Sequence, residues 1–250
     1  MESLEYKWRV DGNEHSLRMI FVTGTKGQPY RFGAGNESAL VDVGDFYLAE
    51  IPVTQALWNH VMGDGNPALN RGLTLPQENV SWDALMLPDG FWQRINASGI
   101  RTQLAAAGSL GEARFRLPTE TEWEYAARGG PHWRNGFIFS GGNDIDAVAW
   151  YGRKHGDHTQ PVAQKIPNQL GFYDMSGNVW EWCQDVHTPD VGLIPTDGSA
   201  FTGAGDDRVL RGGCFHNWAV HCTVNKRYEI QSDFHDGCIG FRLALSAEHA

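Results

Sequence analysis

The stretch Arg116–Arg128 (RLPTETEWEYAAR) carries the clearest local signal in the chain, because it predicts where one helix begins and ends. Thr119, followed three positions later by Glu122, forms a capping box, in which each side chain accepts a hydrogen bond from a backbone N–H at the helix start. Trp123 and the alanines behind it give the inward-facing stripe. The glycine pair at 129–130 ends the helix. We therefore expect a short helix with its cap at Thr119.

Shorter signals before this helix predict two strands and two further helical segments. Residues 18–22 and 45–49 are apolar runs bounded by glycine-rich turns, which is typical of strands. Thr54 is a candidate N-cap for a helix that ends at the glycines that follow residue 62. Another helix is expected to start near Ser81, to break at Pro88–Gly90 and to resume directly afterwards. Helices and strands thus follow one another without a regular repeat.

Composition indicates one irregular, loop-rich domain spanning residues 1–250. The chain has 250 residues, of which 41% are hydrophobic, with 30 Gly and 11 Pro. That hydrophobic fraction is enough for a core, and the many turn formers argue against long elements. The final run Ile239–Leu245 predicts a closing strand. We expect an α+β fold with short antiparallel strands and two to three helices.

Charge and local pattern exclude several classes of protein. The formal net charge is −10 and no basic stripe occurs, so nucleic acid is not an expected partner. No stretch approaches the ~20 apolar residues of a membrane span. The N-terminus lacks the apolar region of a signal peptide, so either the chain stays inside the cell or a targeting segment has been removed. The four cysteines show no CxxC spacing, so we do not expect a zinc site.

Four strings in the chain together resemble the formylglycine-generating-enzyme (sulfatase-modifying-factor) family, over about residues 18–245. They are residues 78–83 (ENVSWD), residues 116–128, residues 171–182 (GFYDMSGNVWEW), and residues 210–213 (LRGG) with 240–242 (GFR). The resemblance implies a C-type-lectin-like fold. It leaves three classes open, since the scaffold carries unrelated activities: copper-dependent oxidases that make formylglycine, iron enzymes of thiohistidine biosynthesis, and non-catalytic binding proteins such as the variable proteins of diversity-generating retroelements.

The metal-dependent members of the family are not matched at the positions that carry their metals. In the resembling oxidases two cysteines five positions apart follow the glycine pair and bind copper. Here the first position holds Asn217 and the second Cys222, while Cys214 comes three residues too early. Histidines are dispersed rather than clustered, at positions 60, 132, 155 and 158. We therefore expect neither copper nor iron, and keep an oxidase or sulfoxide synthase as the alternative function.

A structural calcium ion is the metal that the resemblance does imply. Its ligands, carried over position by position, are the side chains of Asp174 and Glu181 and the carbonyls of Gly177 and Val179. Such hard oxygen ligands are those that calcium prefers. The alternative is that Glu181 caps or salt-bridges a loop. A second calcium site of the family is expected to be absent, because Val148 and Lys154 fall at or near its ligand positions.

Residues 214–239, here called the C-terminal window, lie between the glycine pair and the GFR string. The window mixes rings, charges, thiols and glycine with no period of two or 3.6, which argues against a packed element. Such a mixture on the loops of a rigid scaffold is typical of a binding face. The predicted ligand-binding residues are Cys214, Phe215, His216, Asn217, Trp218, His221, Asn225, Tyr228, Phe234, His235, Asp236 and Cys238. The alternative is that Trp218, Cys222 and Tyr228 are core residues.

The window also fits template-adenine mutagenesis, which in the resembling variable proteins is aimed at this segment. Every residue of the string 234–239 (FHDGCI) is reachable from an AAC codon by changing adenines only. Lys226, Glu229, Gln231 and Trp218 would stay fixed by the template. The sequence thus predicts a non-catalytic, receptor- or adhesin-like protein that binds a protein or cell-surface ligand through hypervariable loops. A chaperone-like partner within a larger complex is a third class.

Overall fold

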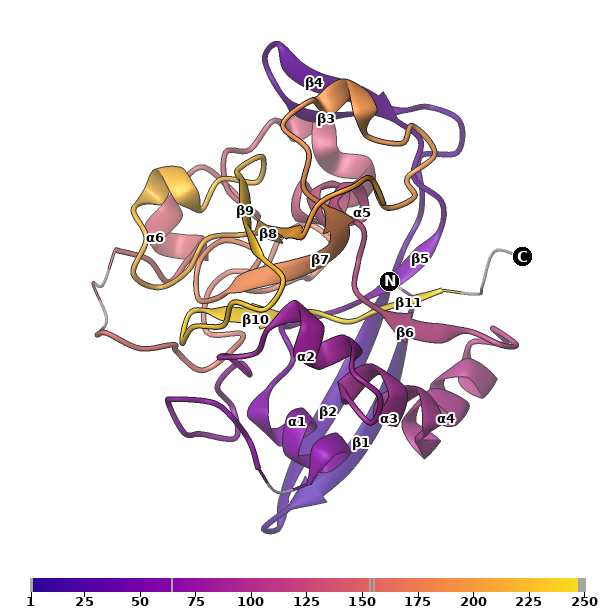
Figure 1. Cartoon of the computed structure of the whole chain (residues 1–250), viewed down its shortest axis with the longest axis vertical. Coiled ribbons are helices and arrows are strands. Elements are labelled where there is room, and N and C mark those ends of the chain that lie inside the picture. The colour runs from indigo at the N-terminus through magenta and orange to yellow at the C-terminus, as the bar shows by residue number, and fades with distance from the viewer. Residues whose placement is uncertain (1, 64, 153, 155, 247–250) are drawn as a thin grey trace.

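Strands from both ends of the chain meet in one antiparallel sheet in the computed structural model, which describes residues 2–63, 65–152, 154 and 156–246 (Figure 1). The sheet order is β1-β2-β5-β11-β6. The bounds are β1 Ser3–Val10, β2 Asn13–Val22, β5 Phe46–Ala49, β11 Ala244–Ser246 and β6 Arg114–Arg116. The two strands expected at 18–22 and 45–49 are confirmed as β2 and β5. β1 was not expected, and it pairs with β2 through a turn at Asp11 and Gly12, both with positive φ.

A second sheet, in the order β10-β7-β8-β9, carries the window. Its strands are β7 Trp180–Val186, β8 Asp207–Arg211, β9 Arg227–Gln231 and β10 Ile239–Phe241, and β10 runs parallel to β7. The single closing strand expected at Ile239–Leu245 is wrong in its continuity. β10 lies in the second sheet and β11 in the first, because the side chain of Arg242 between them points into the core.

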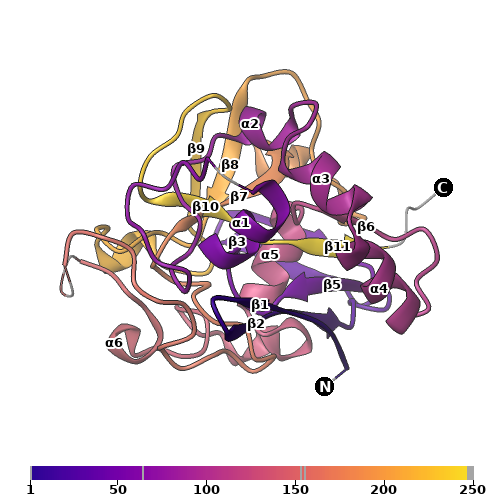
Figure 2. The ribbon, with the colours of Figure 1, turned by 90° about the horizontal axis from the view of Figure 1, so that it is seen from below.

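Helices α1–α6 are short; α1 contacts β2, α4 contacts β1, and α3 packs against α1, α2 and α4 (Figure 2). They are α1 Gln55–Met62, α2 Trp82–Met86, α3 Phe91–Ala97, α4 Gly99–Ala107, α5 Glu120–Ala127 and α6 Ile145–Val148. The predicted caps Thr54, Ser81 and Thr119 each accept a backbone N–H at a helix start. The capping box of α5 is confirmed in both directions. α4 and α6 were not expected, so the six short helices of the described residues exceed the two to three predicted, while the α+β class is confirmed.

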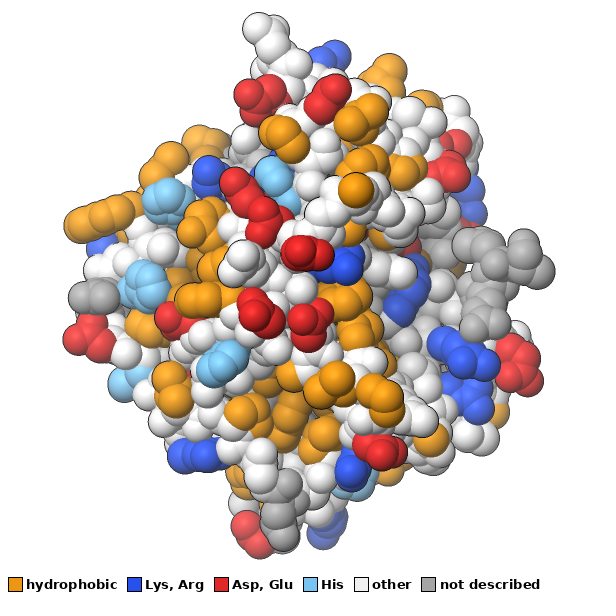
Figure 3. Space-filling view, in the orientation of Figure 1, with side chains coloured by type: hydrophobic (Ala, Val, Ile, Leu, Met, Phe, Trp, Pro, Cys, Tyr) orange, Lys and Arg blue, Asp and Glu red, His pale blue; other side chains and the backbone are white. Residues whose placement is uncertain are grey.

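Remaining elements form turns and a distal hairpin. β3 Tyr30–Ala34 and β4 Glu37–Val41 pair with one another at the top of Figure 1, and 3-10 turns lie at η1 Gly130–Asn135, η2 Val191–Leu193 and η3 Ala219–His221. None of the helices in the described ranges is long and apolar enough to cross a membrane. His155, one of the histidines predicted to be dispersed, lies outside the described residues.

The core consists of two main hydrophobic clusters, each with residues from both sheets, and α5 packs against β7 and β8 of the second sheet. All eight residues of α5 are buried, including three glutamates. Trp123 of α5 and Trp182 of β7 are completely buried. Buried carboxylates are costly unless they are paired and hydrogen-bonded. The partners of these glutamates therefore decide what holds the second sheet in place.

Candidate functional site

Buried arginines flank the C-terminal window on both sides. Arg211, just before it, donates to Glu120 (3.0 Å) and Glu124 (2.6 Å) of α5. Arg242, just after it, donates to both oxygens of Glu181 at 2.8–3.2 Å. All five side chains are fully buried. We call these five residues the charged frame, and it fixes the two points where the window leaves and re-enters the core.

The predicted calcium ligands lie beside this frame. Glu181 accepts from Arg242 and from Trp123 Nε1 at 2.7 Å, so the salt-bridge alternative describes its contacts. Asp174 accepts Ala163 N at 2.8 Å, and burial raises the pKa of its carboxyl to about 6. Gly177 N donates to Gly212 O, and Val179 is fully buried directly before β7 begins. Both carboxylates thus accept hydrogen bonds from protein groups, and the calcium ion stays a prediction.

The window begins with a turn that requires glycine. Gly212 and Gly213 both have positive φ, at 98° and 73°. A Cβ at residue 213 would lie 2.7 Å from both Cys222 Sγ and His221 O. Two hydrogen bonds close the turn that follows: Cys214 N donates to Asn217 Oδ1, and Asn217 N donates to Cys214 O. Asn217, which stands where the resembling oxidases have a cysteine, therefore shapes the loop.

The predicted ligand-binding residues fall into three levels of exposure. Trp218 is 75% exposed, and Tyr228 and Phe234 are 42% exposed. The exposed members are Trp218, Tyr228, Phe234, His235 and Asp236; the half-buried ones are His216, Asn217, His221 and Asn225; the buried ones are Cys214, Phe215 and Cys238. Figure 3 shows histidine, acidic and apolar side chains interspersed on its left half, where Figure 1 places the window. The structure thus places nine of these residues at the surface and three beneath it.

Contacts from outside the window hold its exposed residues in place. The ring of Tyr228 stacks on Trp180 with centroids 5.4 Å apart. His235 Nδ1 lies 2.9 Å from Asn79 Oδ1, and Asn79 N donates to Asp236 O. Asn79 belongs to the ENVSWD string, so a motif quoted for the family also positions the window. Sequence reasoning missed this role, because nothing in the string indicates a partner so distant in the chain.

Two window cysteines and a histidine converge beneath the surface. Cys214 Sγ, Cys238 Sγ and one ring nitrogen of His216 lie within 4.8 Å of one another. Burial alone would raise the pKa of the Cys214 thiol, but hydrogen bonds from Cys238 and His216 outweigh it and lower the pKa to about 6. The hydrogen bond to Cys214, and then burial, raise the pKa of Cys238. Cys214 is thus the more acidic thiol of the pair.

Cys222 stays apart from this group. It packs with Phe139, Val148 and Ala149, and burial raises the pKa of its thiol to about 12. The buried-hydrophobe alternative thus describes Cys222. Sequence reasoning missed the convergence of Cys214 with Cys238, because no spacing rule predicts a contact made through two strands of a sheet.

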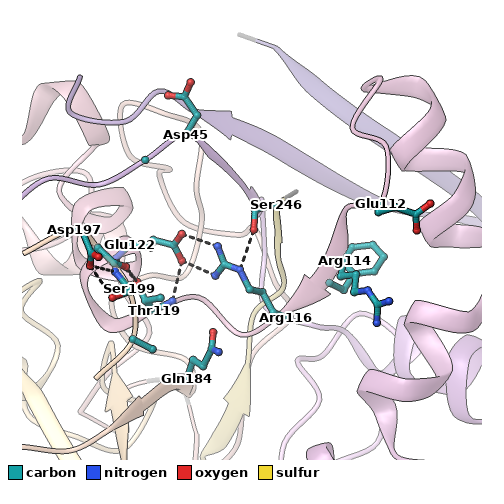
Figure 4. Close-up of a pocket in the computed structure, with 14 residues that line it drawn as sticks. Asp45, Glu112, Arg114, Arg116, Thr119, Glu122, Gln184, Asp197, Ser199 and Ser246 are labelled. Atoms are coloured by element: carbon teal, nitrogen blue, oxygen red, sulfur yellow. Dashed lines mark hydrogen bonds and ion pairs between the residues drawn. The ribbon is translucent and has the colours of Figure 1, made fainter. Parts of the chain in front are cut away.

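A large hollow lies elsewhere, between β6, the start of α5 and residues 197–200 (Figure 4). Its volume is 960 Å³. Arg116 lines it and forms a bidentate salt bridge with Glu122, with N–O distances of 2.6 and 2.7 Å. Its Nε donates to Ser246 Oγ at 3.1 Å. The arginine's charge is thus neutralised inside the wall of the hollow.

Comparison with curated proteins places relatives along most of the chain. Residues 14–247 match the family described as a sulfatase-modifying factor enzyme 1-like domain. A chaperone protein LppX of Paenibacillus barcinonensis is 35% identical over 59% of this chain and 65% of its own length. A formylglycine-generating enzyme of Streptomyces coelicolor is 38% identical over 53% of this chain and 47% of its own. The chain thus spans between about half and two thirds of the length of these two relatives.

Comparison with solved structures adds a match over nearly the whole chain. Treponema denticola variable protein 1 superposes with a TM-score of 0.76 and 28% identity, covering 96% of this chain and 98% of that one. The C-type-lectin-like fold implied by the sequence is therefore confirmed.

Proposed function

The chain belongs to the sulfatase-modifying factor enzyme 1-like family, and on that premise we propose that it is a non-catalytic protein that binds a ligand through the C-terminal window. The observation that carries the proposal is the arrangement of exposed rings and charges on β9 and the loops around it, in a segment whose two ends are fixed by buried arginines. A rigid scaffold with adaptable loops is the usual form of a binding face.

The exposed residues favour a protein or cell-surface ligand. Trp218, Tyr228 and Phe234 offer large ring surfaces, and His235 and Asp236 offer hydrogen bonds beside them. Aromatic residues of this kind dominate the energetics of protein interfaces. The similarity to a variable protein over nearly the full length supports this function. It also supports the hypothesis that the window is diversified by a retroelement.

Binding can be tested with two matched double variants. The domain is panned against a random-peptide phage library and a glycan array, in parallel with Trp218→Ala/Phe234→Ala and with Leu40→Ala/Leu193→Ala. Leu40 and Leu193 are 59% and 56% exposed on the distal hairpin and η2, so the control removes comparable apolar surface away from the window. We expect the window variant alone to lose the enriched sequences or glycans. Equal enrichment by all three proteins would refute the proposal.

Hypervariability needs a separate measurement, because a fixed window could also bind a ligand. Deep sequencing of the gene's 3′ end across related isolates and one cultured population should find changes concentrated between codons 214 and 239, at template-adenine positions. Codons 218, 226, 229 and 231 should stay constant. A window as invariant as Arg116–Arg128 would refute diversification and leave the binding proposal in place.

Oxidation of a substrate cysteine is the second candidate, favoured by the relatives named formylglycine-generating enzymes. The positions that would hold copper do not fit it. Asn217 occupies one, with its amide oxygen 3.1 Å from Cys214 N, and Cys222 at the other is buried against apolar residues. We expect that the copper-treated protein does not convert the cysteine of a peptide to formylglycine, as monitored by mass spectrometry of the peptide. Turnover would establish the enzyme and overturn the first proposal.

A further inference from the structure

A side-chain group that lies beneath the binding face has the composition of a metal site. Cys214, His216 and Cys238 bring two sulfurs and one ring nitrogen within 4.8 Å of one another. We propose that these three residues bind one soft metal ion, Zn(II) or Cu(I). Thiolate and imidazole are the ligands that both ions favour. The ligand set shares no residue with positions 217 and 222, where the resembling oxidases carry their copper pair.

The dimensions of the group suit an ion of this kind. Zinc lies about 2.3 Å from sulfur and about 2.0–2.1 Å from nitrogen, so tetrahedral donors stand roughly 3.5–3.8 Å apart. Because no pair of the three atoms exceeds 4.8 Å, the ion fits after small side-chain rotations. Three protein ligands leave a fourth position of a tetrahedron open. His216 is half-buried, so the group lies at the lower edge of the face rather than in a sealed core.

Backbone hydrogen bonds hold both cysteines beside residues 178–180, where β7 begins. Phe215 N, next to Cys214, donates to Asn178 O at 3.0 Å. Trp180 N donates to Cys238 O at 2.8 Å, where β10 joins β7. Residues 178 and 180 therefore bring together two sulfurs that are distant in sequence. A site whose ligands are placed before the metal arrives avoids part of the ordering cost of binding.

Neighbouring side chains orient the ligands and favour a cation. The ring of Phe215 meets that of His216 edge to face, with centroids 5.3 Å apart. Asp236 Oδ1 accepts Cys238 N at 3.1 Å, so a carboxylate stands beside the second sulfur. When a metal binds, both thiols lose their protons, and the two thiolates with this carboxylate concentrate negative charge that a mono- or divalent cation offsets. Such outer partners typically change metal affinity by about 10–100-fold.

Metal binding can be measured directly on the reduced chain. The protein is titrated with Co(II) as the spectroscopic substitute for Zn(II), followed by Zn(II) displacement, and separately with Cu(I) against a coloured chelator. We expect one equivalent to bind, with sulfur-to-cobalt charge transfer and tetrahedral cobalt bands in the first arm. Binding in either arm supports the site, and the arm with the higher affinity identifies the ion. Absence of stoichiometric binding in both arms overturns it.

Variants distinguish this group from the other thiols. Cys214→Ser, Cys238→Ser and His216→Asn should each weaken binding by at least about 100-fold, the upper end of what losing an outer partner costs. Cys222→Ser is the matched control, because it removes another buried thiol outside the group. His216 is half-buried, so its variant stays informative if a cysteine variant fails to fold. Loss of binding in Cys222→Ser alone, or equal binding in all variants, overturns the proposal.

Discussion

The charged frame buries its ionised side chains in pairs, whereas the C-terminal window exposes several of its rings and polar side chains to solvent. In the frame, Arg211 and Arg242 are fully buried, and each donates to carboxylates that are also fully buried. In the window, Trp218, His235 and Asp236 are directed to solvent. A buried charge that loses its partner is strongly destabilising, whereas an exposed side chain is usually replaced at little cost. The comparison predicts that stability depends far more on the frame than on the window.

The largest expected effect is the loss of one frame charge. Arg242→Met leaves Glu181 buried with only Trp123 as a side-chain donor among the contacts described. We expect the free energy of unfolding to fall by about 3–5 kcal/mol, measured by denaturant titration. Arg242→Met/Glu181→Gln is the control, since it removes both charges and should lose less than the single variant. A single variant within 1 kcal/mol of the original chain would refute the frame's role.

A second effect comes from Asp185 of β7, a buried carboxyl that contacts the frame. It accepts Glu120 N at 2.7 Å and Phe201 N at 2.9 Å, while burial and then the charge of Glu120 raise its pKa to about 7. Because this folded pKa lies above the ordinary value of 3.8, the stabilising contribution is full below about pH 4 and is lost as the pH rises through about 7. We expect Asp185→Asn to reduce the fall in unfolding free energy across this range by on the order of 4 kcal/mol.

The control for this pH dependence is Asp197→Asn. Hydrogen bonds from Ser199 lower the pKa of Asp197, so its contribution changes only at acidic pH and its removal should leave the pH 4–7 slope unchanged. Unfolding is followed by fluorescence at several pH values in that range. A slope that Asp185→Asn does not alter would mean that the carboxylate is fully stabilised by its two backbone donors.

The boundary between the frame and the window supplies a third, smaller effect. Gly213→Ala places a Cβ 2.7 Å from His221 O, whereas Gly12→Ala, at a similar positive φ, meets no atom within 4 Å. Both glycines have positive φ, at 73° for Gly213 and 82° for Gly12, so both changes carry a similar left-handed backbone cost and their difference reports mainly the close approach at the window's start. We expect Gly213→Ala to be less stable than Gly12→Ala by about 1–3 kcal/mol, measured by thermal unfolding. Equal losses would show that the window's first turn yields to accommodate a side chain.

The sequence predicted what depends on local patterns and missed what depends on distant contacts. The capping box at Thr119 and the break between α2 and α3 are local, and both are confirmed. The split of the closing strand at Arg242 was missed, because it depends on a carboxylate 61 positions earlier. The same limit hid the meeting of Cys214 with Cys238. The family strings indicated the fold, while the exposure of each window residue needed the packed structure.

The smallest expected effect tests the window itself. Trp218→Ala removes a ring that is 75% exposed, so we expect the unfolding free energy to stay within about 0.5 kcal/mol of the original. Trp182→Ala is the same chemical change at a fully buried ring that donates to Val80 O, and it should cost about 3–5 kcal/mol. Denaturant titration of both variants measures the contrast. A loss at Trp218 approaching that at Trp182 would place this ring in the core in solution, and the window would then be a structural segment with little freedom to diversify.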